Sequence, residues 1–197
     1  MAKFYFRYGA MNCGKSIALL TVAHNYEENN KKAIIIKSSI DTKADNRIQT
    51  RIGLERKVDV LINPEESFRP YLKSWMNSDL ACILVDEAQF LTSKQVEELW
   101  VASKELDIPI ICYGLRTNFK GELFEGSQRL LALADELEEL ITICECGKRA
   151  KFNARFIDGE FATEGDSVVI DGSNSRVTYK PMCGKCFVKR KYNGYFN

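Results

Sequence analysis

Hydrophobic positions along the first 140 residues form two patterns, short apolar runs and longer stretches with helical spacing. Short runs in which most or every second residue is apolar predict β-strands. These runs cover residues 3–8, 32–39, 56–62, 80–86 and 108–114. The run "LACILVD" (Leu80–Asp86) is apolar almost throughout, as expected of a strand that is buried on both faces of a sheet.

Longer stretches between these runs carry apolar residues at helical spacing and predict four helices. The first follows the first strand, the second starts at Pro64 with Pro70 as a potential interruption, the third starts with Ser93 as its cap, and the last reaches Ile141. The inner faces of the first, third and last helices consist of Leu19, Val22, Ala23 and Tyr26; of Val96, Leu99, Trp100 and Ser103; and of Leu130, Ala134, Leu137 and Ile141.

Strands that alternate with helices predict an α/β fold, in which helices cover both faces of a parallel sheet. After the last predicted helix the pattern changes to paired cysteines, scattered glycines and short β-type runs such as "SVVI". We therefore predict two domains, residues 1–140 and 141–197. The acidic residues Glu136, Glu138 and Glu139 are expected on a solvated face of the last helix.

Composition and charge are ordinary for a globular protein, with 45% hydrophobic residues, 28% charged residues and a formal net charge of +1. A near-neutral chain offers no general argument for nucleic acid or an anionic membrane as a partner. No apolar run approaches membrane-spanning length, and the start "MAKFYFRYGA" does not look like a signal peptide. The sequence predicts a cytoplasmic protein that binds neither a membrane nor nucleic acid.

A glycine-framed loop follows the first predicted strand. It reads Gly9, Ala10, Met11, Asn12, Cys13, Gly14, Lys15 and Ser16, which matches the phosphate-loop pattern. Glycines let consecutive backbone N–H groups point at phosphate oxygens, and the next helix adds its positive N-terminal end. Lys15 is predicted to reach the β- and γ-phosphates of ATP, and the Ser16 hydroxyl to bind Mg²⁺. The alternative is a flexible strand-to-helix turn.

Two adjacent carboxylates end the buried strand at residues 80–86 and begin the stretch "DEAQF". Ligands of parallel sheets bind at the carboxyl ends of the strands, so both side chains are expected at the phosphate site. We predict that Asp86 helps to hold Mg²⁺ and that Glu87 accepts a proton from an attacking hydroxyl. The alternative is an acidic turn that only faces solvent.

Four of the seven cysteines form two close pairs, Cys144 with Cys146 and Cys183 with Cys186. Two such pairs resemble the halves of a tetrahedral thiolate site, and a closed site of four cysteines holds structural zinc. A small domain with few large apolar residues would need such a staple to fold. Four free thiols are the alternative. The single histidine, His24, is predicted to be structural.

The stretch "GLRTNFKGELF" (Gly114–Phe124) follows a buried strand at the same edge of the sheet. Its glycines, with Arg116 and Phe119, suit a loop that lines a substrate pocket. An ordinary connection between a strand and a helix is the alternative.

The motifs "GAMNCGKS", "DEAQF", "GLRTNFKGELF", the paired cysteines and "VVIDG" together resemble the zinc-containing, phosphate-loop type of thymidine kinase, in that family's order and over nearly the whole chain. The resemblance implies a phosphate-loop NTPase core with a small C-terminal lasso domain that zinc holds. It also implies transfer of the γ-phosphate of ATP to the 5′-hydroxyl of thymidine, which supplies dTMP for DNA synthesis.

The resemblance further implies roles for individual residues. Glu87 corresponds to the proton acceptor of the family, and Arg155 to an arginine near the transferred phosphoryl group. The ATP-binding residues are Gly9 to Ser16 together with Asp86, Glu87, Ala88 and Gln89. The thymidine-binding residues are Met11, Phe90, Phe119, Tyr179 and the lasso residues Val168, Val169, Ile170, Asp171 and Gly172.

Family members are usually homotetramers that dTTP, the end product of the pathway, inhibits, so the resemblance implies both properties. Three features depart from the family: Lys43 stands where many relatives have arginine, "VIDG" has one glycine where relatives often have two, and residues 172–183 form a longer stretch. A second functional class stays open from the residues alone, namely a phosphate-loop ATPase whose zinc domain binds nucleic acid.

Overall fold

A parallel six-stranded sheet forms the centre of the computed structural model, which describes residues 1–41, 46–76, 78–166 and 176–192. Its strands lie in the order β5-β2-β6-β7-β1-β8, and every neighbouring pair is parallel. They are β1 (Phe4–Tyr8), β2 (Lys32–Ser38), β5 (Val60–Ile62), β6 (Leu80–Asp86), β7 (Ile110–Gly114) and β8 (Glu136–Glu139). The expected α/β fold is confirmed.

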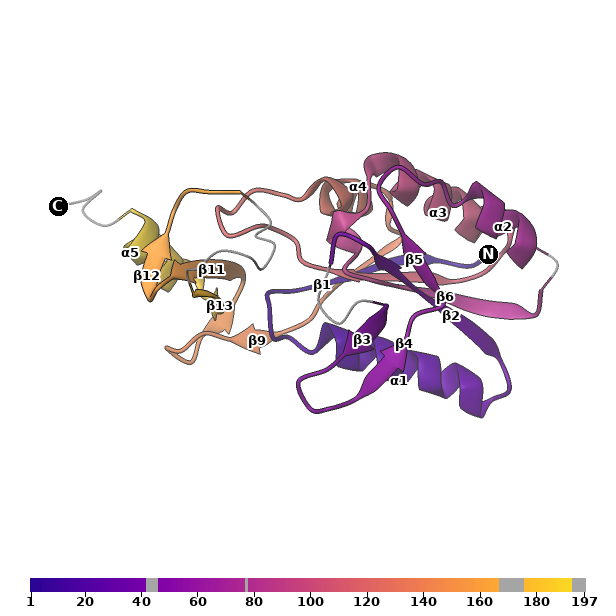
Figure 1. The fold of residues 1–197 in the computed structure, drawn as a ribbon, viewed down its shortest axis with the longest axis horizontal. Coiled ribbons are helices and arrows are strands. Elements are labelled where there is room, and N and C mark those ends of the chain that lie inside the picture. The colour runs from indigo at the N-terminus through magenta and orange to yellow at the C-terminus, as the bar shows by residue number, and fades with distance from the viewer. Residues whose placement is uncertain (42–45, 77, 167–175, 193–197) are drawn as a thin grey trace.

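Helices cover both faces of this sheet (Figure 1). Helix α1 (Lys15–Glu28) packs on one face, beside a hairpin of β3 (Arg47–Gln49) and β4 (Glu55–Lys57). The other face carries α2 (Arg69–Trp75), α3 (Ser93–Glu105), α4 (Glu125–Leu133) and the short 3-10 helix η1 (Ala88–Phe90). No helix in the described ranges is long and apolar enough to cross a membrane.

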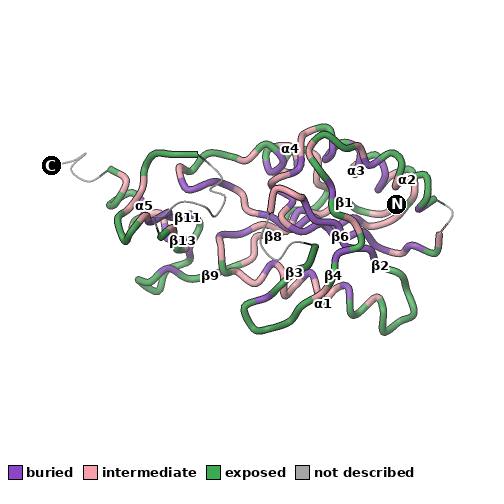
Figure 2. Tube along the Cα trace, in the orientation of Figure 1, coloured by how far each residue is buried: buried purple, intermediate pink, exposed green. Residues whose placement is uncertain are grey.

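The apolar strands separate two hydrophobic cores. On β2, Ile34 and Ile36 face the core under α2, α3 and α4, whereas Ile35 faces the core under α1. Buried residues follow the strands through the middle of the large unit in Figure 2. A strand that supplies both cores must be apolar on both sides, which explains the near-continuous hydrophobic runs.

A smaller unit extends from one end of the large sheet (Figure 1). It contains an antiparallel sheet in the order β12-β11-β13, a two-stranded ribbon and a final helix. Its elements are β9 (Thr142–Ile143), β10 (Arg149–Ala150), β11 (Phe152–Ile157), β12 (Glu160–Ala162), β13 (Val177–Met182) and α5 (Gly184–Lys191). A separate hydrophobic cluster, which includes Phe156, Met182 and Phe187, forms the core of this unit.

Three predicted boundaries were wrong. The run at 56–62 divides into β4 and β5, because residues between them turn from the hairpin into the large sheet. Helix α2 starts only at Arg69, and Pro70 lies in its first turn, where a proline needs no hydrogen-bonding N–H. Thr92 rather than Ser93 caps α3, in a reciprocal capping box with Gln95.

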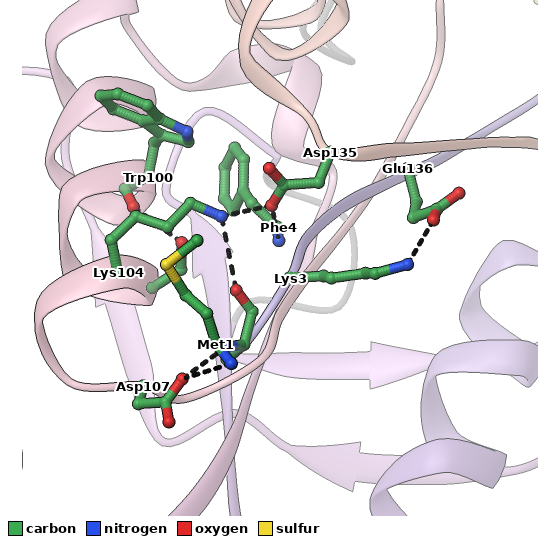
Figure 3. Close-up of polar contacts among 10 residues, drawn as sticks. Met1, Lys3, Phe4, Trp100, Lys104, Asp107, Asp135 and Glu136 are labelled. Carbon is green, nitrogen blue, oxygen red and sulfur yellow. Dashed lines mark hydrogen bonds and ion pairs between the residues drawn. The ribbon is translucent and has the colours of Figure 1, made fainter.

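The last predicted helix is present as α4, but its predicted extent to Ile141 was wrong, because α4 ends at Leu133 and the chain continues as strand β8. Asp135 explains this change: its N–H donates to the Phe4 carbonyl at 2.8 Å, and its carboxylate accepts from the Phe4 N–H at 2.6 Å. In Figure 3 dashed lines join the Asp135 carboxylate to the Lys104 ammonium group and to the Phe4 N–H, and Lys3 to Glu136 nearby. These contacts hold the segment extended along β1.

The acidic run therefore lies on an edge strand instead of a helix face. Glu136, Glu138 and Glu139 pair with Lys3, Arg7 and Arg149, respectively. His24 is exposed on α1 and lies 3.3 Å from Glu28. The predicted strand-like run "SVVI" and the departures at Lys43 and Gly172 lie outside the described residues.

Candidate active site

The phosphate-loop segment connects the carboxyl end of β1 to α1. Asn12 and Gly14 adopt left-handed conformations with φ of 66° and 82°, which curl the backbone. A Cβ atom on Gly9 would lie 2.6 Å from both the Cys13 Sγ and the Leu140 carbonyl oxygen, so only glycine fits there. No side chain in the described residues caps the N-terminus of α1. Its free N–H groups can therefore receive an anion.

Lys15 is a buried cation that lies across this loop. Its Nζ lies 3.3 Å from the Ala10 carbonyl oxygen and 3.6 Å from the Cys13 Sγ. The ammonium group is therefore held beside the backbone that would surround a phosphate. Ser16 follows as the second residue of α1 and is half-buried.

Asp86 ends β6 next to this loop and is only 4% exposed. Within the described residues its Oδ1 atom has no hydrogen-bond partner. Burial and the neighbouring Glu87 carboxylate raise the pKa of Asp86 to about 7, while the positive charge of Lys15 opposes this shift. A buried carboxylate oxygen without a partner fits a Mg²⁺ site, because a bound cation would satisfy it.

Glu87 has a left-handed backbone with φ of 48° and ψ of 39°, which is uncommon for a residue other than glycine. Gln89 is buried behind it and donates a hydrogen bond from Nε2 to the Glu87 carboxylate. The Oε1 atom of the same Gln89 accepts from the Leu115 N–H at 3.0 Å. This amide connects the end of β6 to the loop that follows β7.

The predicted nucleoside residues gather only in part. The Arg155 guanidinium lies over the Phe119 ring at 3.6 Å, and its Nε donates to the Tyr179 hydroxyl at 3.0 Å. Phe90 instead packs edge-on against Phe124, with ring centroids 5.7 Å apart. Met11 lies in the phosphate loop, where its N–H donates to the Asn153 side chain at 2.7 Å. The remaining five predicted residues, Val168, Val169, Ile170, Asp171 and Gly172, lie outside the described residues.

The four paired cysteines meet in the smaller unit. Their sulfur atoms all lie within 4.8 Å of one another, so the cluster could hold a metal ion such as zinc. Gly147 turns the chain after the first pair with φ of 80°. Backbone N–H groups of Cys146 and Cys183 lower the pKa of Cys144 to about 7, whereas contacts with the other three thiols raise the pKa of Cys186 to about 12. The shift at Cys144 favours the thiolate form that binds metals.

Comparisons with known proteins decide the family. A family profile described as "Thymidine kinase" matches residues 2–187. The chain belongs to the thymidine kinase family. The thymidine kinase of Lactiplantibacillus plantarum is 45% identical over 185 residues, 93% of this chain and 94% of that protein. The thymidine kinase of Lactococcus lactis is 44% identical over 191 residues, 96% of this chain and 98% of that protein.

A solved structure, Bacteroides Pif1 bound to ssDNA, is also similar, with 11% identity and a TM-score of 0.38 over 73% of this chain and 39% of that chain. A likeness this weak supports no argument about function. Membership of the thymidine kinase family confirms the resemblance that the sequence motifs indicated. The alternative of a nucleic-acid-dependent ATPase is not favoured.

Two buried groups of this thymidine kinase family member escaped the sequence analysis. Lys37 on β2 is buried beside Asp86 in the sheet register and lies 3.0 Å from the Asp41 carboxylate. Asn153 on β11 bonds to both the phosphate loop and the loop after β7. Lys37 could have been noticed, because a lysine within an apolar strand is unusual. Asn153 could not, because a single asparagine near the cysteines indicates no function.

Proposed function

We propose that this protein transfers the γ-phosphate of ATP to the 5′-hydroxyl of thymidine. The product, dTMP, would enter DNA synthesis as part of pyrimidine deoxynucleoside salvage. One observation carries this proposal: a phosphate loop and the Asp86–Glu87 pair share the carboxyl edge of a parallel sheet, in a chain that belongs to the thymidine kinase family.

Residues 9–16 would surround the phosphates of ATP, and the N–H groups at the N-terminus of α1 would bind them. The Gly9 and Met11 N–H groups already donate to the Gly114 carbonyl and to Asn153. Lys15 would neutralise negative charge on the β- and γ-phosphates. Ser16 and Asp86 would hold Mg²⁺, which when bound offsets charge on the phosphates and helps to orient them. Ala88 and Gln89 would lie next to the nucleotide, and Gln89 would keep the Glu87 carboxylate oriented.

Glu87 would act as the general base. It would accept the proton of the 5′-hydroxyl as the oxygen of that group attacks the γ-phosphorus in line with the leaving ADP. The contact with Gln89 supports this role, because a fixed carboxylate loses little orientation entropy when the substrate arrives.

Met11, Phe90, Phe119 and Tyr179, with the backbone at 168–172, would bind the thymidine base. The cluster of Arg155, Phe119 and Tyr179 supports a pocket at the junction of the two units. We propose that residues 1–140 form the ATP-binding domain and residues 141–197 a lasso domain. Structural Zn²⁺ at the four cysteines would hold that domain together.

We further propose a cytoplasmic homotetramer that dTTP inhibits. Light scattering after gel filtration tests the assembly. The inhibition is tested by thymidine phosphorylation at rising dTTP concentrations.

A phosphoryl-transfer assay over a panel of nucleosides tests the proposed activity. Thymidine should be consumed in a one-to-one ratio with ATP, and deoxycytidine should remain unphosphorylated. A matched reaction with single-stranded DNA in place of thymidine separates the alternative class. ATP hydrolysis that rises with DNA but not with thymidine would overturn the proposal.

A further inference from the structure

Asn153 is a buried carboxamide at the junction of the two units, only 3% exposed. Its Oδ1 atom accepts a hydrogen bond from the Met11 N–H at 2.7 Å. Its Nδ2 atom donates to the Thr117 carbonyl at 3.2 Å. One side chain of β11 thus joins the phosphate loop to the loop that follows β7.

Asn153 and Arg155 share one face of β11, because side chains two residues apart on a strand point the same way. Arg155 stacks on Phe119, which is also in the loop after β7. This face of β11 therefore contacts the proposed thymidine pocket through Arg155 and the phosphate loop through Asn153. It forms a continuous physical connection between the two halves of the site.

The contact with Met11 is specific in chemistry. An asparagine side chain offers one acceptor and one donor group, and Asn153 uses both, each on backbone that belongs to a different loop. The Met11 N–H points at Asn153, so in this conformation the position of that part of the phosphate loop depends on where β11 lies. A nucleoside that orders the smaller unit would order Met11 as well.

We propose that Asn153 is a positioning residue that couples the two substrate sites, so that thymidine tightens the binding of ATP and ATP tightens the binding of thymidine. This inference rests on the proposed thymidine kinase activity. The first ligand fixes β11 against the core, and the second ligand then loses less conformational entropy when it binds. The coupling must be equal in both directions by thermodynamic linkage.

Calorimetric titration with a non-hydrolysable ATP analogue tests the coupling, with and without saturating thymidine. In the unmodified protein, thymidine should lower the dissociation constant of the analogue by about fivefold or more. In Asn153→Ala the ratio of the dissociation constants without and with thymidine should fall close to one. Asn153→Asp, which keeps the acceptor for Met11 but loses the donor to Thr117, should give an intermediate ratio.

Gln95→Ala is the matched control. Gln95, on α3, is also a buried carboxamide that joins two segments. It accepts from the Thr92 N–H and donates to the Asn63 and Glu66 carbonyls, none of which belongs to the phosphate loop. This variant should lose stability and keep the full coupling ratio. Full coupling in Asn153→Ala, or loss of coupling in Gln95→Ala, would overturn the inference.

Amide exchange at Met11 gives a readout that does not depend on activity. The Met11 N–H should exchange slowly in the unmodified protein and in Asn153→Asp, and faster in Asn153→Ala. Equal exchange in all three would show that this hydrogen bond is not maintained. A protein that binds thymidine without any coupling contradicts only this inference, whereas a protein that does not bind thymidine contradicts the proposed function too.

Discussion

The Arg155 guanidinium lies over the Phe119 ring, with 3.6 Å between its Cζ and the ring centroid. Arg155 comes from β11 of the smaller unit, and Phe119 comes from the loop after β7 of the large sheet. The same guanidinium donates to the Tyr179 hydroxyl and to the Asp166 carbonyl. Arg155 is only 1% exposed, and its contacts join the smaller unit to the large sheet.

These contacts predict that Arg155→Met raises the KM for thymidine more than it lowers kcat. The stacked cation contributes roughly 0.5–2 kcal/mol and the lost hydrogen bonds a similar amount, so KM should rise by about tenfold or more. Steady-state kinetics with varied thymidine measure both constants. Arg155→Lys should recover only part of the loss, since an ammonium group lacks the planar fork.

Arg129→Lys is the control for this experiment, because Arg129 pairs with Glu97 away from the site. The family resemblance offers the competing expectation that Arg155 acts beside the transferred phosphoryl group. A large fall in kcat with an unchanged KM for thymidine would favour that role and contradict the one that the contacts indicate.

Local patterns predicted the parts of the fold that depend on neighbouring residues. The strand at 80–86, the phosphate-loop segment and the third helix follow from an apolar run, framing glycines and the helical spacing of apolar residues. The predicted continuation of the last helix was wrong because the chain after Leu133 bonds to Phe4, which is distant in the sequence. Helical spacing of Leu137 and Ile141 could not reveal that Asp135 joins the edge of the sheet.

The residues of the candidate site also fall into two groups, those that the sequence could predict and those that it could not. The paired cysteines could be predicted as a metal site from their spacing. The Asp86–Glu87 pair could be predicted from its position at the end of a buried strand. Asn153 was not readable, since its role comes from two hydrogen bonds to backbone in other parts of the chain. Such contacts depend on tertiary packing and leave no periodic signal in a single sequence.

Glu87→Gln tests the general base. The glutamine keeps the size of the side chain and removes its ability to accept a proton, so kcat should fall by roughly 10²–10⁴ while the KM for ATP changes little. Rapid-quench measurement of phosphoryl transfer isolates the chemical step. Glu97→Gln, on the exposed face of α3, is the control and should keep normal turnover. Normal turnover in Glu87→Gln would exclude Glu87 as the base.

Zinc removal tests the cysteine cluster. Elemental analysis should find one zinc per chain in the purified protein, and Cys183→Ala should abolish it. Structural zinc contributes roughly 10–16 kcal/mol of apparent binding energy in small peptides, so the smaller unit should unfold first. Loss of amide protection around Phe152 and Phe187, whose rings stack 4.7 Å apart, would report this unfolding.

Cys112→Ala is the matched control for the metal, because Cys112 is fully buried in the core of the large sheet. This variant should lose stability and still bind one zinc per chain. A zinc-free protein with a folded smaller unit would contradict a structural metal.

The raised pKa of Asp86 predicts that the stability of the protein depends on pH in the absence of Mg²⁺. Its pKa lies at about 7 in the folded protein, raised by burial and by Glu87 and Asp41 and opposed by Lys15, whereas an unfolded aspartate titrates near 3.9. Between these values the folded state retains a proton that the unfolded state has lost. The contribution of Asp86 to the free energy of unfolding must therefore fall as pH rises from about 4 to 7.

Asp86→Asn removes this titration, so the variant should gain stability relative to the unmodified protein as pH rises. Urea unfolding at pH 5, 6, 7 and 8 measures the difference, which should grow by at most about 1.4 kcal/mol per pH unit and level off above about pH 7. Asp79→Asn, the same substitution at an exposed position, is the control. A flat or shrinking difference for Asp86→Asn would show that this carboxylate is ionised in the folded protein over this pH range, and would contradict the raised pKa.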